Sequence, residues 1–302
     1  MDYIDIHADD YAISLHASEN LIERVKAGKL DSISILPNMS CFKICMERLL
    51  EEWDEFPKKP LISVHINLME GHCLSPAETV PDLVDPEGYF KVSWGSLLLA
   101  SYNPMSYKRI KSQLEAEIQV QIERISDAEP AECELRLDSH QHTHMIPIVF
   151  DAMMTAVRKQ QYPVTFIRVA REPIMPFLKH IDLYSSYSVT NIVKNVILNL
   201  YAGNVERQLR AMKIEPALLW GLVMTGHMDV DRVKKLYPSM LGVCKRKKKK
   251  MELLFHPGCV LAEEINEEYV KKGFVEFHLS EGRKIERHAV DNLAQEVIHE
   301  QG

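Results

Sequence analysis

The chain has 302 residues, with 36 lysine and arginine residues against 43 acidic ones, and therefore a formal net charge of −7 at pH 7. Its 46% hydrophobic and 26% charged residues are ordinary for a globular protein and exclude a disordered or collagen-like chain. The overall acidity argues against a general nucleic-acid binder, and no apolar run approaches the roughly 18 residues that a membrane-spanning helix needs.

Seven short apolar stretches with strand character alternate with longer helical stretches along the chain. The predicted strands span 2–7, 32–36, 61–68, 134–138, 164–169, 217–223 and 251–256. The predicted helices span 17–28, 41–53, 106–126, 147–161, 191–212 and 229–242. Strands that are regularly separated by helices indicate βαβ units and a parallel sheet, either a closed barrel or an open doubly wound sheet. No GxGxxG motif follows a strand, which removes the main signature of a dinucleotide-binding sheet.

The chain shows no internal repeat, low-complexity tract or linker that would mark a domain boundary, so we expect residues 1–302 to form one domain. The stretch 69–105 is rich in proline and glycine and indicates a long excursion after the third strand. Excursions of this length often cover a site. The basic run KRKKKK at 245–250 is interpreted as a solvated linker between a helix and the last strand, with nucleic-acid binding as the alternative.

Polar side chains gather at the predicted carboxyl ends of five strands, which is where parallel α/β folds bind ligands. They are Asp9 and Asp10, His65, the motif DSHQHTH at 138–144, Arg168 and His256. The motif is the strongest signal, because it places three histidines at alternate positions behind an aspartate. Taken one at a time, the other residues are also typical of solvated acids, hydrogen-bonded core histidines or a capped loop.

The best candidates for metal ligands are Asp10, His65 and His140. Two imidazoles and a carboxylate are a common ligand set for a divalent ion, and they leave positions open for water. Asp9 would then deprotonate the water, and His256 would protonate the leaving nitrogen. This equipment is typical of a metal-dependent amide or ester hydrolase.

These residues lie in four ordered motifs, HADDYAIS at 7–14, VHINL at 64–68, LDSHQHTH at 137–144 and FHPG at 255–258. In this order they resemble the motifs of the YdjC-like carbohydrate deacetylases, which include the chito-oligosaccharide deacetylases. The resemblance extends from residue 4 to about residue 280. It implies a TIM-like (β/α) barrel of about seven parallel strands, complete or incomplete, that is related to the polysaccharide deacetylases. It also implies hydrolysis of an N-acetyl group from a small N-acetylated sugar, with release of acetate.

The resemblance assigns roles by motif position. It implies that Asp10, His65 and His140 bind the metal ion, that Asp9 is the base and that His256 is the acid. Mg²⁺ is the metal that the family favours, whereas two imidazoles suit Zn²⁺, Mn²⁺ or Co²⁺ better on ligand chemistry.

Three further residues are candidates for supporting roles. Arg168 matches the arginine that closes the family's fifth strand, where it would hold Asp9 or the substrate. Asp138 would orient a ligand histidine, and His144 is a candidate for substrate binding or ligand support. The chain departs from the family at His7, where asparagine is usual, and at the Tyr11-Ala12 pair, where Phe-Gly is usual. Loss of the glycine constrains the backbone, because a positive φ costs alanine more than glycine.

The expected partner is a small N-acetylated sugar, and a homo-oligomer is left open. Two other function classes compete with a sugar deacetylase: a metal-dependent amidohydrolase or esterase with a non-sugar substrate, and a non-catalytic sugar-binding protein. A pure binder would need neither a free base nor an acid, so Asp9 and His256 argue against it. The acidic amino terminus and the scattered cysteines, with no CxxC pair, predict a cytoplasmic protein.

Overall fold

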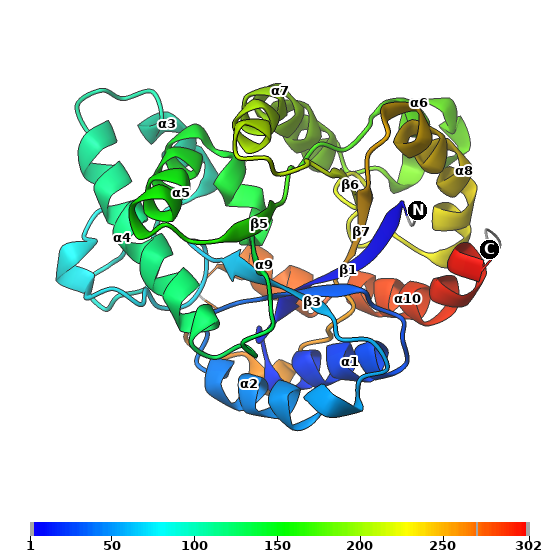
Figure 1. The fold of residues 1–302 in the computed structure, drawn as a ribbon, viewed down its shortest axis with the longest axis horizontal. Helices are drawn as coiled ribbons and strands as arrows, with labels where there is room; N and C mark the ends of the chain where they lie inside the picture. The colour runs from blue at the N-terminus through cyan, green and yellow to red at the C-terminus, as the bar shows by residue number, and fades with distance from the viewer. Residues whose placement is uncertain (1–2, 270, 300–302) are drawn as a thin grey trace.

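In the computed structural model, which describes residues 3–269 and 271–299, seven parallel strands form one sheet in the order β5-β4-β3-β2-β1-β7-β6. The strands are β1 (Ile4–Tyr11), β2 (Ser32–Ile35), β3 (Leu61–Ile66), β4 (Leu135–Ser139), β5 (Val164–Ile167), β6 (Leu218–Trp220) and β7 (Met251–Phe255). The sheet curls into a half-barrel, an incomplete TIM-like barrel, with β5 and β6 at its two edges (Figure 1). The prediction of seven parallel strands in a barrel-like α/β fold is thereby confirmed.

Helices surround the curled sheet (Figure 1). The α-helices are α1 (Leu15–Lys26), α2 (Phe42–Glu51), α3 (Trp94–Ala100), α4 (Tyr107–Ser126), α5 (Pro147–Gln160), α6 (Met175–Lys179), α7 (Val189–Ala211), α8 (Val230–Lys247), α9 (Lys272–His278) and α10 (Glu281–His299). The 3₁₀ turns are η1 (Trp53–Glu55), η2 (Ala77–Thr79), η3 (His140–Met145), η4 (Ile181–Ser186) and η5 (Ala262–Glu264). The six predicted helices are present. None of the described helices combines the length and apolar character that crossing a membrane requires.

The basic run 245–250 differs from its interpretation as a linker. Its first half forms the last turn of α8, where basic side chains interact favourably with the helix dipole. Lys248 then takes a left-handed conformation, with φ of 53°, and ends the helix. Only residues 248–250 connect α8 to β7, so the helix is longer than the sequence pattern indicated.

The two faces of the sheet differ in polarity. On one face, apolar side chains such as Ile6, Ile33 and Val64 are buried in the main hydrophobic core. The other face carries equally buried polar side chains. Arg168, directly after β5, contacts Glu252 in β7 with 3.2 Å between Nε and Oε2. Because these residues come from opposite sides of the curl, the polar face must be the concave one.

The edge strands β5 and β6 are tied together near their carboxyl ends. The N–H of Leu219 donates to the carbonyl of Arg171 at 2.9 Å. The carboxylate of Glu172 is fully buried and accepts hydrogen bonds from the N–H groups of residues 221–223. Burial raises the pKa of Glu172, although these donors act in the opposite direction. The turn after β6 is therefore held against the end of β5.

Gly221 occupies a position in this turn that only glycine fits. Its φ is +146°, and a Cβ there would lie 2.3 Å from the carbonyl oxygen of Leu254. We expect Gly221→Ala to lower the free energy of unfolding by at least about 2 kcal/mol, because backbone strain and overpacking each cost about 1–3 kcal/mol. Urea denaturation followed by circular dichroism measures the change.

The matched control is Gly242→Ala in α8, where an added Cβ would meet no atom within 4 Å. This substitution should raise the free energy of unfolding by about 0.5–1 kcal/mol, since alanine favours helices over glycine. Equal effects of the two substitutions would contradict the assignment of strain to Gly221.

Candidate active site

The end of β1 directs its two adjacent carboxylates to different neighbours. Pairing with β2 shifts register between Ala8 and Tyr11, which marks a bulge in the strand. Asp10 and Ala12 both take left-handed conformations, with φ of 68° and 66°. Such values are uncommon for residues other than glycine. Ala12 thus adopts the positive φ for which the family's glycine is better suited.

Asp10, His65 and His140 come together from three strand ends and are all buried. Asp10 Oδ1 lies 3.0 Å from His140 Nδ1 and 3.5 Å from His65 Nε2. The three potential ligand atoms lie within 4.8 Å of one another, and His65 Nε2 has no hydrogen-bond partner. A buried nitrogen without a partner, beside a second imidazole and a carboxylate, fits a divalent ion.

Asp138 orients His65 from behind. Its Oδ1 lies 2.6 Å from His65 Nδ1, and its other oxygen accepts a hydrogen bond from Ser34. Because an ionised carboxylate can only accept, Nδ1 carries the proton and Nε2 faces the candidate metal centre. Burial alone would lower the pKa of His65, but attraction to Asp9 and Asp138 outweighs it and raises the pKa to about 10.

Glu70 was not predicted from the sequence. It contacts the imidazole of His140, just as Asp138 contacts the imidazole of His65. Its Oε2 lies 3.1 Å from His140 Nε2 and 3.0 Å from His278 Nε2. Burial would raise the pKa of Glu70, but His278 and His140 lower it to about 2. The sequence offered one indication of this role: Glu70 is an acidic residue that follows His65 closely, just beyond the end of the predicted strand.

The second oxygen of Asp10 is held by Arg283, a buried residue of α10. Arg283 Nη2 donates to Asp10 Oδ2 at 2.5 Å, and Nη1 donates to the carbonyl of Gly258 at 2.9 Å. Burial would raise the pKa of Asp10, but His140 and Arg283 together hold it well below its ordinary value. Asp10 is therefore ionised, as a metal ligand must be.

Asp9 faces the interior of the curl, where the guanidinium of Arg168 binds its carboxylate in a bidentate manner. The distances are 2.9 Å from Nη1 to Oδ2 and 2.9 Å from Nη2 to Oδ1. Burial would raise the pKa of Asp9, but Arg168 and then His65 outweigh it and hold the pKa well below its ordinary value. Of the two predicted alternatives for Arg168, the geometry shows contact with Asp9.

His7 packs in the polar interior of the curl. Its Nδ1 lies 2.6 Å from Ser32 Oγ, and its Nε2 lies 2.7 Å from Ser34 Oγ and 3.0 Å from Asp9 Oδ1. It is not a member of the cluster around Asp10. His7 therefore helps to position Asp9 in this structure.

A cavity of about 200 Å³ opens beside the candidate metal centre. Its walls include Asp9, His140 and His256, together with Phe274 and Phe277 of α9. His256 is anchored by Glu286, whose Oε2 accepts from the backbone N–H at 2.5 Å and lies 3.3 Å from Nδ1. The remaining lining residues are Gln141, His142, Asn191, Lys194, Leu222, Thr225 and His278.

One expectation is not matched by this geometry. The excursion 69–105 contributes Glu70 behind His140 but none of the described residues that line the cavity, which α7, α9 and the strand ends enclose instead. His144, a candidate for substrate binding or ligand support, lies outside the cavity lining: its Nε2 lies 2.9 Å from the carbonyl oxygen of Arg168, and its Nδ1 lies 2.6 Å from Ser139 Oγ. Burial lowers the pKa of His144 to about 4, so it is neutral and braces Arg168.

Comparisons with known proteins identify the family of the chain. Residues 3–292 match the family model described as YdjC-like protein. The chain is 27% identical over 168 residues to a carbohydrate deacetylase from Mus musculus, covering 55% of this chain and 50% of that protein. It is 27% identical over 221 residues to a carbohydrate deacetylase from Thermoanaerobacter pseudethanolicus, covering 72% of this chain and 82% of that protein. The chain spans about half the length of the mouse and human relatives that it matches.

One solved structure has the same fold across nearly the whole chain. It is a protein from Enterococcus faecalis that is provisionally described as a cellobiose-phosphate cleavage protein. The TM-score is 0.58 at 17% sequence identity, and the match covers 97% of this chain and 95% of that one. At this identity the likeness supports the barrel fold and carries no information about substrate.

Glu70 should affect metal affinity although it lies outside the candidate ligand set. We expect Glu70→Gln to weaken binding of Mn²⁺ or Zn²⁺ by about 10- to 100-fold, because a ligand histidine loses the carboxylate that orients it. Isothermal titration calorimetry on metal-stripped protein measures the affinity. Glu78→Gln, an exposed acid in η2, serves as the control and should bind as the wild type does. Equal affinities of the two variants would contradict the role of Glu70.

Metal binding should also depend on pH through His65. Its pKa of about 10 means that Nε2 is protonated at neutral pH in the metal-free protein, so an ion must displace a proton. We expect Mn²⁺ affinity to rise between pH 6.5 and pH 8.5, by up to about tenfold per pH unit, which calorimetry at three pH values measures. Stability of the metal-free fold should change in the opposite direction, because a raised pKa stabilises the fold only while the group is protonated. An affinity that is flat with pH would contradict this prediction.

Proposed function

Because the chain belongs to the YdjC-like protein family, we propose that it is a metal-dependent hydrolase that removes N-acetyl groups from a small N-acetylated carbohydrate and releases acetate. A chito-oligosaccharide is the expected type of substrate. The observation that supports this most strongly is the meeting of two histidines and a carboxylate beside a separate, ionised carboxylate. The relatives named carbohydrate deacetylase support the choice of substrate class.

Asp10, His65 and His140 would hold the ion, which the donor set and the orphaned His65 Nε2 fit. When bound, a divalent ion acts as a Lewis acid that polarises the amide carbonyl and acidifies water. Asp138 and Glu70 keep the two imidazoles oriented for this task. Mg²⁺ is the family's metal, whereas the imidazoles favour Zn²⁺, Mn²⁺ or Co²⁺.

Asp9 is the proposed base. A carboxylate has about four lone-pair positions, of which Arg168 occupies two and His7 one. The position that stays open belongs to Oδ2, which lies 3.9 Å from His65 Nε2 and thus on the side of the candidate metal centre. Oδ2 would take the proton from the water molecule as its oxygen adds to the amide carbon.

His256 is the proposed acid. Its Nδ1 lies 3.3 Å from the carboxylate of Glu286, which leaves Nε2 as the nitrogen available to the cavity. Nε2 would donate a proton to the amide nitrogen as the C–N bond breaks, so that a free amine and acetate leave. Phe274 and Phe277 provide apolar surface beside it.

The first experiment measures acetate release from N,N′-diacetylchitobiose by metal-stripped protein after addition of Mg²⁺, Zn²⁺, Mn²⁺ or Co²⁺. We expect release to depend on metal, and Asp9→Asn to slow it by about 10²–10⁴-fold, because the amide cannot accept the proton. Asp54→Asn, whose side chain is 99% exposed, should match the wild type.

Two results would count against the proposal. If Asp9→Asn binds metal and keeps wild-type activity, Asp9 is not the base. If no metal restores acetate release although the protein binds metal with His65 and His140 intact, the sugar substrate is wrong. Other amides and esters would then be tested in its place.

A further inference from the structure

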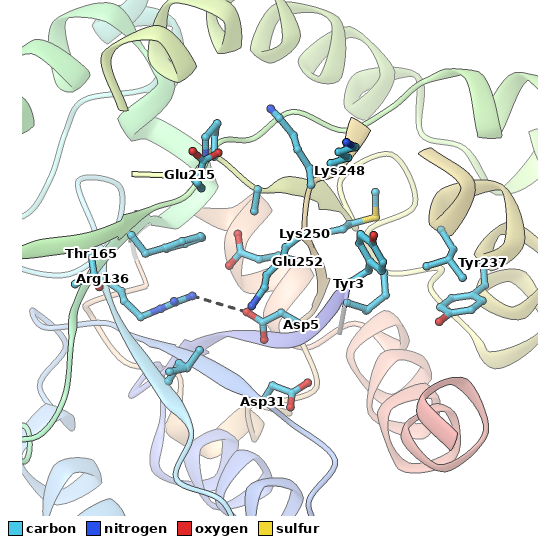
Figure 2. A pocket seen from close by; sticks show the side chains of 18 of the residues that line it. Tyr3, Asp5, Asp31, Arg136, Thr165, Glu215, Tyr237, Lys248, Lys250 and Glu252 are labelled. Carbon is cyan, nitrogen blue, oxygen red and sulfur yellow. Dashed lines mark ion pairs between the residues drawn. The ribbon is translucent and has the colours of Figure 1, made fainter. Parts of the chain in front are cut away.

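A second cavity, of about 750 Å³, lies at the amino ends of the strands, away from the candidate active site. Its walls include the starts of β1 and β7, residues of β4 and β5, and the segment just before β6 (Figure 2). The contacts described above between β5 and β6 lie near the carboxyl ends of these strands. This second cavity therefore opens at the opposite end of the curled sheet. Its volume is in the range that holds small organic ligands, roughly 300–1,000 Å³.

The floor of this cavity holds Arg136, a guanidinium with few polar contacts. Arg136 is only 8% exposed, and its guanidinium carbon lies 4.0 Å from the centre of the Phe166 ring. Its polar contacts within the described chain are a 3.4 Å hydrogen bond from Nε to Ser63 and a 3.7 Å ion pair from Nη2 to Asp5 (Figure 2). A guanidinium has five N–H donors, so most of them are left for a ligand.

Lysines from the basic run line the same cavity. Lys248 and Lys250 make no ion pair with any residue that the structure describes, whereas Lys249 between them pairs with Glu206 at 2.8 Å. The left-handed turn at Lys248 ends α8 and leads the chain into β7, which brings this part of the run to the cavity. Figure 2 shows Lys248 and Lys250 among the side chains that line the cavity.

The acidic residues of the cavity are mostly committed to other partners. Asp31 pairs with Lys58 at 2.7 Å, and Glu252 contacts Arg168 at 3.2 Å. Asp5 accepts a hydrogen bond from Ser32 at 2.7 Å and offsets part of the charge of Arg136, which lies 3.7 Å away. Glu215 is the lining acid that makes no ion pair within the described residues. The charge left without a close partner is therefore mainly positive.

We propose that this cavity binds a small molecule that carries an oxyanion, with the phosphate or carboxylate held by Arg136, Lys248 and Lys250. The planar fork of a stacked arginine matches both anions, and the two lysines add positive charge at the rim. Tyr3, Phe166 and Met251 provide apolar wall for the rest of the molecule. This site is separate from the candidate active site and does not depend on the proposed deacetylase activity.

The test is calorimetric titration of metal-stripped full-length protein with phenyl phosphate, benzoate and benzyl alcohol. These probes compare phosphate, carboxylate and no charge on similar aromatic bodies. We expect saturable binding of at least one of the two anions, and binding of benzyl alcohol at least tenfold weaker. Arg136→Gln should weaken anion binding by about 10- to 100-fold, because a charged hydrogen-bonding partner is lost.

Three further variants keep the result interpretable. Lys250→Gln should weaken binding several-fold and serves if Arg136→Gln fails to fold. Lys249→Gln removes an adjacent lysine of the same cavity that is committed to Glu206, and it should change the affinity less than Lys250→Gln. Lys194→Gln in the candidate active-site cavity should leave binding unchanged.

The proposal is overturned if neither anion binds, if benzyl alcohol binds as tightly as the anions, or if folded Arg136→Gln and Lys250→Gln both bind like the wild type. Loss of binding in Lys194→Gln would also overturn it, because the anion would then lie in the other cavity. Tighter binding of phenyl phosphate or of benzoate would identify the anion that the site prefers.

Discussion

A buried guanidinium stabilises the carboxylates in the interior of the curled sheet. Arg168 is completely inaccessible to solvent and lies within 3.2 Å of carboxylates from three other strands, Asp9, Asp138 and Glu252. Attraction to Arg168 lowers the pKa of both Asp9 and Asp138, and two ionised acids in a buried interior would be strongly unfavourable without this charge. Arg168 therefore stabilises the polar concave face of the half-barrel. This face carries the residues of the candidate active site.

The same interior gives two adjacent aspartates different partners. Asp9 is bound by Arg168, whereas Asp10 is bound by Arg283 and faces the two histidines. Both are held ionised, but only Asp10 lies in the candidate ligand set. The bulge in β1 and the left-handed backbone at Asp10 produce this separation, so local strain in the strand places one acid in the candidate ligand set and the other against Arg168.

Hydrogen bonds connect the interior network to both ends of the barrel. Glu252 lines the cavity at the amino ends and contacts Arg168, which holds Asp9 beside the cavity at the carboxyl ends. The fold alone, shared with a protein of 17% identity, does not identify the chemistry. The side chains at the carboxyl ends form the candidate metal cluster, and the chain belongs to the YdjC-like family.

The strands, the order of the motifs and the approach of Asp10, His65 and His140 were all predictable from the amino-acid sequence. Alternation and strand–helix periodicity are local, and parallel strands bring their carboxyl ends to one edge of a sheet. The residues that hold these three side chains in place became apparent only in the folded chain. Arg283 reaches Asp10 across 273 positions in the chain, from a helix that the pattern analysis did not predict. Contacts between residues so far apart produce no local pattern in a single sequence, because they form only when the curled sheet and its helices pack together.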